Sequence, residues 1–353
     1  MMKKGIAVLA AGLMLAGSLT GCGKGNTLDG TQTVAVMDET TNVPLAEVSF
    51  LLRYQQAQME SYYGAMLGMT NVYGQDLSGT GTVYGETAKQ SLMEQFNQMY
   101  VLEAEAANYG VELTDDEKTA ISDAAAQFMK DNSAGVQKTL GVTEADVEHV
   151  LTLMTIQEKM YAPLTEDVDT EVSDEEAAQK RIVYVYMSTA GTETDEDGNT
   201  VDLTDEEKAA KKQELQDILD AAAESGDLKA AVDAANENRD ENSKLSASET
   251  TYGADSTTPA EEVRTAADAL KDGELAPIIE TDTGYYAVQM VSTFDEEATA
   301  NKKDSIVTER KNTLYQEKCA DLEEQHSFDI KDDVLAELTF DRIYTLNTGS
   351  TEE

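Results

Sequence analysis

The sequence of 353 residues has no tryptophan, four prolines, two cysteines and two histidines. The histidines, His149 and His326, are far apart, and neither an HExxH motif nor a Cys/His cluster accompanies them. This scarcity argues against a zinc site. No GxGxxG motif or P-loop is present, so we expect neither a metal nor a cofactor. Cys319 falls in a helical pattern and is expected to be a small packed residue rather than a nucleophile.

Basic residues are also few. The chain has 26 lysines and arginines against 69 acidic residues, a formal net charge of −43. Such a surface repels nucleic acid and anionic membranes, so neither is expected as a direct partner, and it attracts cationic chains. The alternative is that the charge does no more than solvate the surface. The length and a hydrophobic fraction of 41% allow two or three domains with cores of their own.

The N-terminus carries a processing signal. Two lysines precede an apolar run that is too short for a confident membrane span and ends in small residues, MMKKGIAVLAAGLMLAGSLTGC. The tetrapeptide Leu19 to Cys22 resembles a bacterial lipobox. We therefore expect residues 1–21 to be a signal peptide, Cys22 to carry lipid, and residues 22–32 to form a linker. The alternative is an ordinary secretory peptide with a chance cysteine. Cleavage before Cys22 would change the net charge from −43 to −45, because residues 1–21 carry two lysines and no acidic residue.

Helical periodicity dominates residues 33–170. A short apolar strand precedes a helix that starts at Leu45, and a second helix covers about 87–109 and stops at Gly110. The run TDDE from Thr114 predicts a capping box and a third helix. A further helix starts near Thr143 and contains His149, for which the sequence offers no partner. Residues 294–345 add a long charged helix with too few apolar residues to stand alone, so we expect it to dock on these helices.

The composition changes after residue 171. RIVYVYMS (181–188) reads as a central strand, followed by two helices, a polar loop that contains TTYGADS (250–256), a helix and two strands. The last two strands lie in IIETDTGYYAVQM (278–290), with Gly284 expected to make the turn. The predicted fold is α+β: a helical module from both chain ends, with an antiparallel sheet domain of residues 171–293 inserted. Residues 346–353 are expected to be a disordered tail.

Four segments resemble known motifs. Residues 266–290 and KRIVYVYMS (180–188) resemble the last block and first strand of a parvulin domain, DLKAAVDAAN (227–236) resembles one of its helices, and residues 100–117 resemble the N-terminal helical module of PrsA/SurA-type foldases. The resemblance implies a SurA-N-like chaperone domain at 33–170 and a parvulin-like, FKBP-like peptidyl-prolyl isomerase domain at 171–293. It also implies a lipid-anchored foldase on the outer face of the bacterial cytoplasmic membrane, acting on unfolded or nascent secreted polypeptides.

The departures from the family bear on its activity. Tyr184 and Tyr286 stand where the family has histidines, and Pro259 and Val263 stand near its pocket methionine and phenylalanine. The resemblance makes Tyr184 and Tyr286 the candidate catalytic residues. The candidate substrate-binding residues are Val263, Met187, Val288 and Met290.

Prolyl isomerisation breaks no covalent bond, and its barrier of about 18–20 kcal/mol is amide resonance. Tyrosine can donate and accept hydrogen bonds, so the tyrosine pair either shapes a proline site or only packs across the strands. We expect weak or absent isomerase activity, with a non-catalytic holdase as the alternative. A solute-binding lipoprotein is less favoured, because aromatic anchors are few and the strand count is low.

Overall fold

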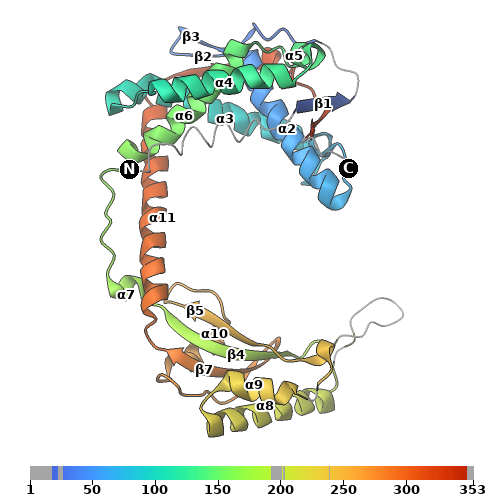
Figure 1. The fold of residues 1–353 in the computed structure, drawn as a ribbon, viewed down its shortest axis with the longest axis vertical. Coiled ribbons are helices and arrows are strands. Elements are labelled where there is room, and N and C mark those ends of the chain that lie inside the picture. The colour runs from blue at the N-terminus through green and yellow to red at the C-terminus, as the bar shows by residue number, and fades with distance from the viewer. Residues whose placement is uncertain (1–17, 23–26, 192–200, 202, 238, 348–353) are drawn as a thin grey trace. The chain divides into compact units, whose positions relative to one another are not determined.

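The structure is a computed structural model that describes residues 18–22, 27–191, 201, 203–237 and 239–347. The core of the expected signal peptide and the last six residues of the expected tail lie outside this range. The chain forms two compact units, Met1–Val168 with Lys311–Glu353 and Asp169–Arg310, here called the helical unit and the sheet unit. The predicted α+β class is confirmed, with a helical module into which a sheet-containing segment is inserted (Figure 1).

The helical unit contains most of the helices. In chain order its elements are β1 (Ser18–Cys22), β2 (Thr33–Met37), β3 (Thr41–Pro44), α2 (Leu45–Leu67), η1 (Val72–Gly74), α3 (Tyr84–Glu105), η2 (Ala106–Tyr109), α4 (Asp115–Asp131), α5 (Ala134–Leu140), α6 (Glu144–Leu164), β8 (Phe328–Ile330), α12 (Asp332–Leu335) and β9 (Ile343–Asn347). Two small antiparallel sheets, β3-β2-β8 and β1-β9, join strands from opposite ends of the chain.

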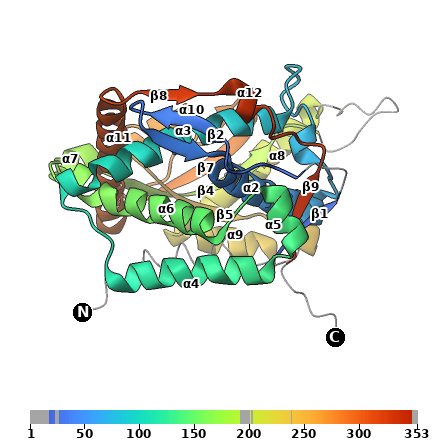
Figure 2. The same cartoon turned by 90° about the horizontal axis from the view of Figure 1, so that it is seen from above.

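Helix α2 is the centre of this unit. Every side chain from Leu45 to Tyr54 is buried, as expected for a helix surrounded by others. Helices α3 and α6 pack on it, and α4 lies beside α6 (Figure 2). The predicted capping box at the start of α4 is confirmed, because Thr114 accepts from the Glu117 amide and Glu117 accepts from the Thr114 amide.

Residues near the start of the helical unit and in its part of helix α11 (Glu296–Glu323) are tightly packed. Gly30, placed in the expected linker, is buried, and its carbonyl accepts from the Ala46 amide at 3.0 Å. A Cβ on Gly30 would lie 1.9 Å from the Gly141 carbonyl oxygen, so only glycine fits this approach. Gly30 is therefore a packed residue of the helical unit. Helix α11 buries Cys319 in the core of this unit, and the expectation that Cys319 is a packed residue is confirmed.

The sheet unit is built on one antiparallel sheet of strand order β5-β4-β7-β6. Helices α8 and α9 cover one face and α10 covers the other (Figure 1). Its elements are α7 (Asp174–Ala177), β4 (Lys180–Ser188), α8 (Asp205–Ser225), α9 (Leu228–Asn236), η3 (Glu241–Ser243), β5 (Ala247–Tyr252), α10 (Glu261–Asp268), β6 (Ile279–Thr281), β7 (Gly284–Ser292) and the first half of α11.

Two sequence predictions for this unit are wrong. Residues 247–252, expected in a polar loop, form strand β5 at the edge of the sheet next to β4. Gly284, expected to make a turn, is the first residue of β7, and the turn lies at residues 282–283. Glycine is needed there for another reason: a Cβ at this position would lie 2.3 Å from the Met187 carbonyl oxygen and 2.6 Å from the Tyr186 ring.

Candidate functional site

Three tyrosines lie together on the α10 face of the sheet, and we call them the tyrosine row: Tyr184, Tyr186 and Tyr286. Side chains alternate along a strand, so Tyr184 and Tyr186 of β4 point to the same face. Tyr286 of β7 is directly opposite Tyr186 in the strand register, with ring centroids 4.7 Å apart. The Tyr184 and Tyr286 rings are 5.9 Å apart. The sheet thus brings the two predicted catalytic positions together with a third tyrosine.

Tyr186 was not among the predicted site residues, although the same strand alternation places it beside Tyr184. It is the most exposed member of the row, at 37%. Its hydroxyl donates to the Thr283 carbonyl at 2.6 Å, which fixes the ring over Gly284. Strand alternation could have identified it from the sequence, whereas its position opposite Tyr286 depends on the register between β4 and β7, which a single sequence does not reveal.

The predicted substrate-binding residues fall into two groups. Val263, Val288 and Met290 are fully buried in the core between the sheet and α10, on the same face as the tyrosine row. Met187 lies on the opposite face, under α8, and is 6% exposed. Met187 therefore cannot share a site with Tyr286. Val263, Val288 and Met290 lie in the core beneath the tyrosine row and are not accessible to solvent.

The hydroxyls of Tyr184 and Tyr286 meet no hydrogen-bond partner among the described residues. Burial, then the neighbouring tyrosines Tyr186 and Tyr184, and finally Glu262, raise the pKa of Tyr286 above its ordinary value. Tyr286 is therefore a neutral hydroxyl at physiological pH, free to donate or accept a hydrogen bond. Residues 169–310 contain no histidine and no cysteine. The row can bind and polarise a ligand, but it offers neither an imidazole nor a thiolate.

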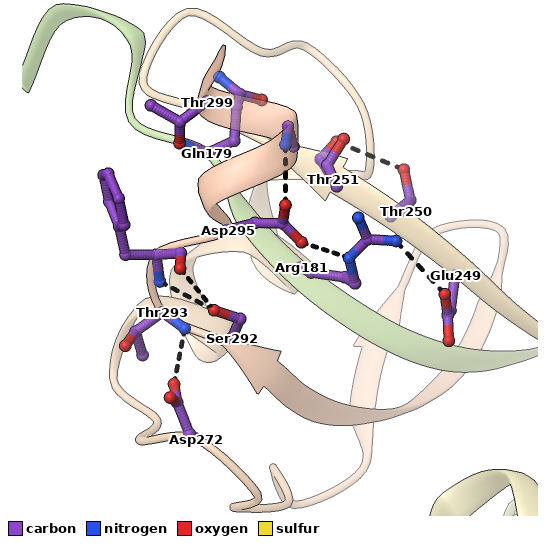
Figure 3. Close-up of polar contacts among 12 residues, drawn as sticks. Gln179, Arg181, Glu249, Thr250, Thr251, Asp272, Ser292, Thr293, Asp295 and Thr299 are labelled. Carbon is purple, nitrogen blue, oxygen red and sulfur yellow. Dashed lines mark hydrogen bonds and ion pairs between the residues drawn. The ribbon is translucent and has the colours of Figure 1, made fainter. Parts of the chain in front are cut away.

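A second polar cluster lies at the start of α11, within the sheet unit (Figure 3). Arg181 pairs with Asp295 and, at 3.5 Å, with Glu249. The hydrogen bond to Arg181 holds the pKa of Asp295 below its ordinary value. An open, polar depression of about 550 Å³ adjoins this cluster, lined by Arg181, Glu249, Thr250, Thr251, Glu297, Ala298 and Asn301. Its arginine is already neutralised, so the cluster anchors the helix rather than offering a free charge.

His149 in the helical unit has partners that the sequence did not reveal. Its Nδ1 is 2.7 Å from Glu47 Oε1, and its Nε2 is 3.2 Å from Glu103 Oε2. The hydroxyl of Tyr100 donates to the other oxygen of Glu47 at 2.6 Å. Burial alone would lower the pKa of His149, but the two carboxylates raise it to about 10. This is a satisfied structural ion pair, contributed by three different helices.

Cys22, the predicted lipidation site, ends strand β1. This strand pairs antiparallel with β9, and Cys22 is opposite Ile343. None of the described helices is long and apolar enough to cross a bilayer. Among the described residues, no three His, Cys, Asp or Glu side chains gather as a metal ion would require.

No family model and no curated protein sequence matches this chain. Among solved structures, the foldase protein PrsA from Lactococcus lactis is 18% identical with a TM-score of 0.34, over 87% of this chain and 97% of that one. PrsA from Streptococcus pneumoniae is 19% identical with a TM-score of 0.30, over 71% and 92%. The peptidylprolyl isomerase PrsA from Bacillus cereus is 14% identical with a TM-score of 0.30, over 74% and 96%.

These three solved structures are PrsA proteins.

Proposed function

We propose that this protein is a lipid-anchored, extracytoplasmic foldase that binds unfolded secreted polypeptides and has a parvulin-like sheet unit with weak isomerase activity. The observation that carries the proposal is the tyrosine row. Three aromatic rings form a partly exposed surface on one face of a sheet, directly above a close-packed core. Partly exposed aromatic rings of this kind bind proline rings and apolar side chains, with little demand on sequence.

The weakness of catalysis follows from what lies under the row. Rate acceleration requires a site that prefers the twisted amide over both planar isomers. An apolar pocket would have to grip the proline ring, yet Val263, Val288 and Met290 are fully buried. Polar groups would have to act on the rotating carbonyl, and the row offers only phenol hydroxyls. The row is therefore suited to binding more than to turnover, which brings the holdase alternative close to this proposal.

No observation favours the solute-binding alternative. The depression beside Arg181 is open, and polar residues dominate its lining. Small-molecule sites are usually enclosed and largely apolar. The lining of this depression includes no aromatic side chain that could hold a ligand.

The isomerase part is tested with a protease-coupled assay on an Ala-Pro peptide. We expect the protein to accelerate exchange less than about tenfold over the uncatalysed process, which takes tens of seconds or longer. Activity well above this level that is lost in Tyr184→Phe and Tyr286→Phe would overturn the weak-activity proposal.

The binding part is tested by light scattering of an aggregating, unfolded model protein. Tyr186→Ala should weaken the suppression of aggregation. Val291→Ala should leave it unchanged, because Val291 is 41% exposed on the same strand as Tyr286 but lies outside the row. Equal suppression by all three proteins would show that the row is not the binding surface.

The anchor is tested by labelling with a radioactive fatty acid in a bacterial host. Label should be incorporated into the wild type and lost in Cys22→Ser, whereas Cys319→Ser keeps it, since these are the only two cysteines. Label that persists in Cys22→Ser would remove the lipid anchor from the proposal.

A further inference from the structure

The strand that ends in Cys22 occupies a slot along β9, and we propose that this slot binds an extended peptide segment once residues 1–21 have been removed. The inference rests on the cleavage before Cys22 that is part of the proposed function. It adds a second client-binding site, in the helical unit, to the tyrosine row of the sheet unit. The occupant is a stretch of unfolded polypeptide that adds a strand to β9.

The slot is formed by one edge of β9 and its surroundings. Residues Ser18 to Cys22 pair with β9 antiparallel over five register positions, from Asn347 to Ile343. The other side of β9 faces α2, where the Leu346 amide donates to Ser61 Oγ at 2.8 Å. Removal of residues 18–21 would therefore open a single, defined edge of the strand. Unpaired strand edges with free amides and carbonyls are sites for strand addition.

Leu19 shows that the slot has a specific side-chain site. It is 3% exposed and belongs to the apolar core of the helical unit. Its amide donates to Asn132 Oδ1 at 2.7 Å in a buried setting, while the Asn132 amide group donates to the Phe128 carbonyl. After cleavage, this core site lacks its leucine and the Asn132 oxygen lacks its donor. A buried acceptor without a donor is costly, so the vacated slot favours a new occupant with a free amide.

The same geometry predicts which sequences fit. Position 19 takes a leucine-sized apolar side chain, whereas Thr20 is exposed and sets no restriction. Position 21 requires a small residue, because a Cβ on Gly21 would lie 3.1 Å from Arg342 Cδ and 3.3 Å from the Tyr344 ring. We expect segments with an apolar residue two positions before glycine or alanine to bind best.

The position of the slot relative to the anchor supports this role. Leu28 packs against the helical core, six residues after Cys22. A stretch of six residues spans at most about 20 Å. Lipid on Cys22 would therefore hold β9 close to the outer face of the membrane. An unfolded chain that has just crossed the membrane would meet the slot there before it folds.

The test measures fluorescence anisotropy of a labelled peptide with the sequence of residues 16–21, AGSLTG. Three forms of the chain are compared, all carrying Cys22→Ser so that no lipid is added. The form that begins at residue 22 should bind the peptide, and the full chain should not, because its own strand fills the slot. The full chain with Leu19→Asp should gain binding, because an aspartate does not remain in an apolar core. This last form keeps the full length of the chain and guards against a folding defect in the shortened one.

Side-chain controls define the site. Asn132→Ala in the form that begins at residue 22 should weaken binding about fivefold, the usual value of one hydrogen bond. Asn108→Ala should have no effect, since the Asn108 side chain, within the described part of the chain, bonds only to Glu105 on the surface of the same unit. A peptide with aspartate in place of its leucine should not bind. Equal binding to the full chain and to the opened forms, or no binding to either opened form, would overturn the slot.

The result of the peptide-binding test can be told apart from the result of the lipid-anchor test. Fatty-acid labelling of Cys22 without peptide binding would refute the slot and leave the anchor in place. Peptide binding to the opened forms without labelling of Cys22 would refute the anchor and show that the slot is used only when the N-terminal strand leaves by another route.

Discussion

The charged side chain of His149 stabilises the helical unit, and this stabilisation depends on pH. Its pKa is raised to about 10 in the folded chain, from 6.5, because Glu103 and Glu47 hold the charged imidazole. The folded state therefore keeps a proton that the unfolded state releases between these two values. The stabilisation is fully present below about pH 6.5, shrinks as the pH rises and is gone above about pH 10.

We predict that His149→Gln lowers the free energy of unfolding by about 1–3 kcal/mol at pH 6. This is less than the loss of a fully buried ion pair costs, because the side chain is one-third exposed and solvent screens its charge. The difference from the wild type should disappear as the pH approaches 10. Urea unfolding followed by circular dichroism at several pH values measures both. Glu148→Gln, the neighbouring residue in α6, is the control and should change stability by less than about 0.5 kcal/mol. A deficit that stays constant up to pH 10 would mean that the imidazole charge is not its source.

A side chain at Gly284 is expected to destabilise the sheet unit. A Cβ would lie 2.3 Å from the Met187 carbonyl oxygen, a backbone atom that cannot move without disturbing β4. Gly284→Ala should therefore destabilise the sheet unit by about 2–4 kcal/mol and shift the tyrosine signals in near-ultraviolet circular dichroism. Gly64→Ala is the matched control, because Gly64 lies within α2 with its nearest contact at 3.5 Å. That variant should be neutral or more stable by up to about 1 kcal/mol.

Among the elements, helix α11 is held in the sheet unit by polar contacts at its first turns. The helix is highly charged and weakly apolar, so its first turns are fixed by polar contacts within the sheet unit. The Asp295 carboxylate accepts from the Ala298 amide at 2.8 Å and pairs with Arg181 (Figure 3). Lys303 pairs with Asp174 at 2.6 Å. These contacts replace the apolar stripe that the sequence lacks.

We predict that Asp295→Ala lowers the stability of the sheet unit by about 2–3 kcal/mol, from a lost helix cap and a lost ion pair. Asp295→Asn keeps a capping side chain and should lose about half as much. The pKa of Asp295 is lowered from 3.8, so its stabilisation is present above about pH 4 and is lost as the pH falls below its folded value. Thermal unfolding at pH 7 and pH 3 measures the effect, with exposed Asp304→Asn as the control. A loss of equal size at both pH values would contradict the role of the charge.

The elements that were predicted correctly are those with strong local signals. The period of apolar residues in α2, the capping box of α4 and the β-branched run of β4 each depend on neighbouring residues alone. Strand β5 was missed because it is an edge strand rich in threonine and serine, with only Tyr252 buried. What makes it a strand is pairing with β4, which no local pattern shows.

In the candidate site too, local patterns were predicted correctly and tertiary pairings were not. Alternation along β4 was sufficient to put Tyr184 on one face, and it also excludes Met187, an odd number of residues away. That Tyr286 is opposite Tyr186 depends on the register of β4 with β7. The partners of His149 come from two other helices, and the packing of Gly30 depends on Gly141, far along the chain. These features are set by tertiary contacts, which a single sequence does not encode in any local pattern.

For the whole molecule, the proposed function implies that the net charge of −43 selects among clients. A strongly acidic protein attracts cationic unfolded chains and repels acidic ones, and the attraction falls within about 10 Å in 0.1 M salt. Aromatic contacts at the tyrosine row would hold either kind of client once it arrives. The protein should therefore suppress the aggregation of a basic unfolded model protein at lower concentrations than an acidic one of similar length. Between about 0.05 M and about 0.5 M salt this preference should fall severalfold, whereas a neutral osmolyte should leave it unchanged. Tyr186→Ala, which keeps the charge, should weaken suppression for both clients without altering their order. A preference that ignores salt would mean that the acidic surface only keeps the protein in solution.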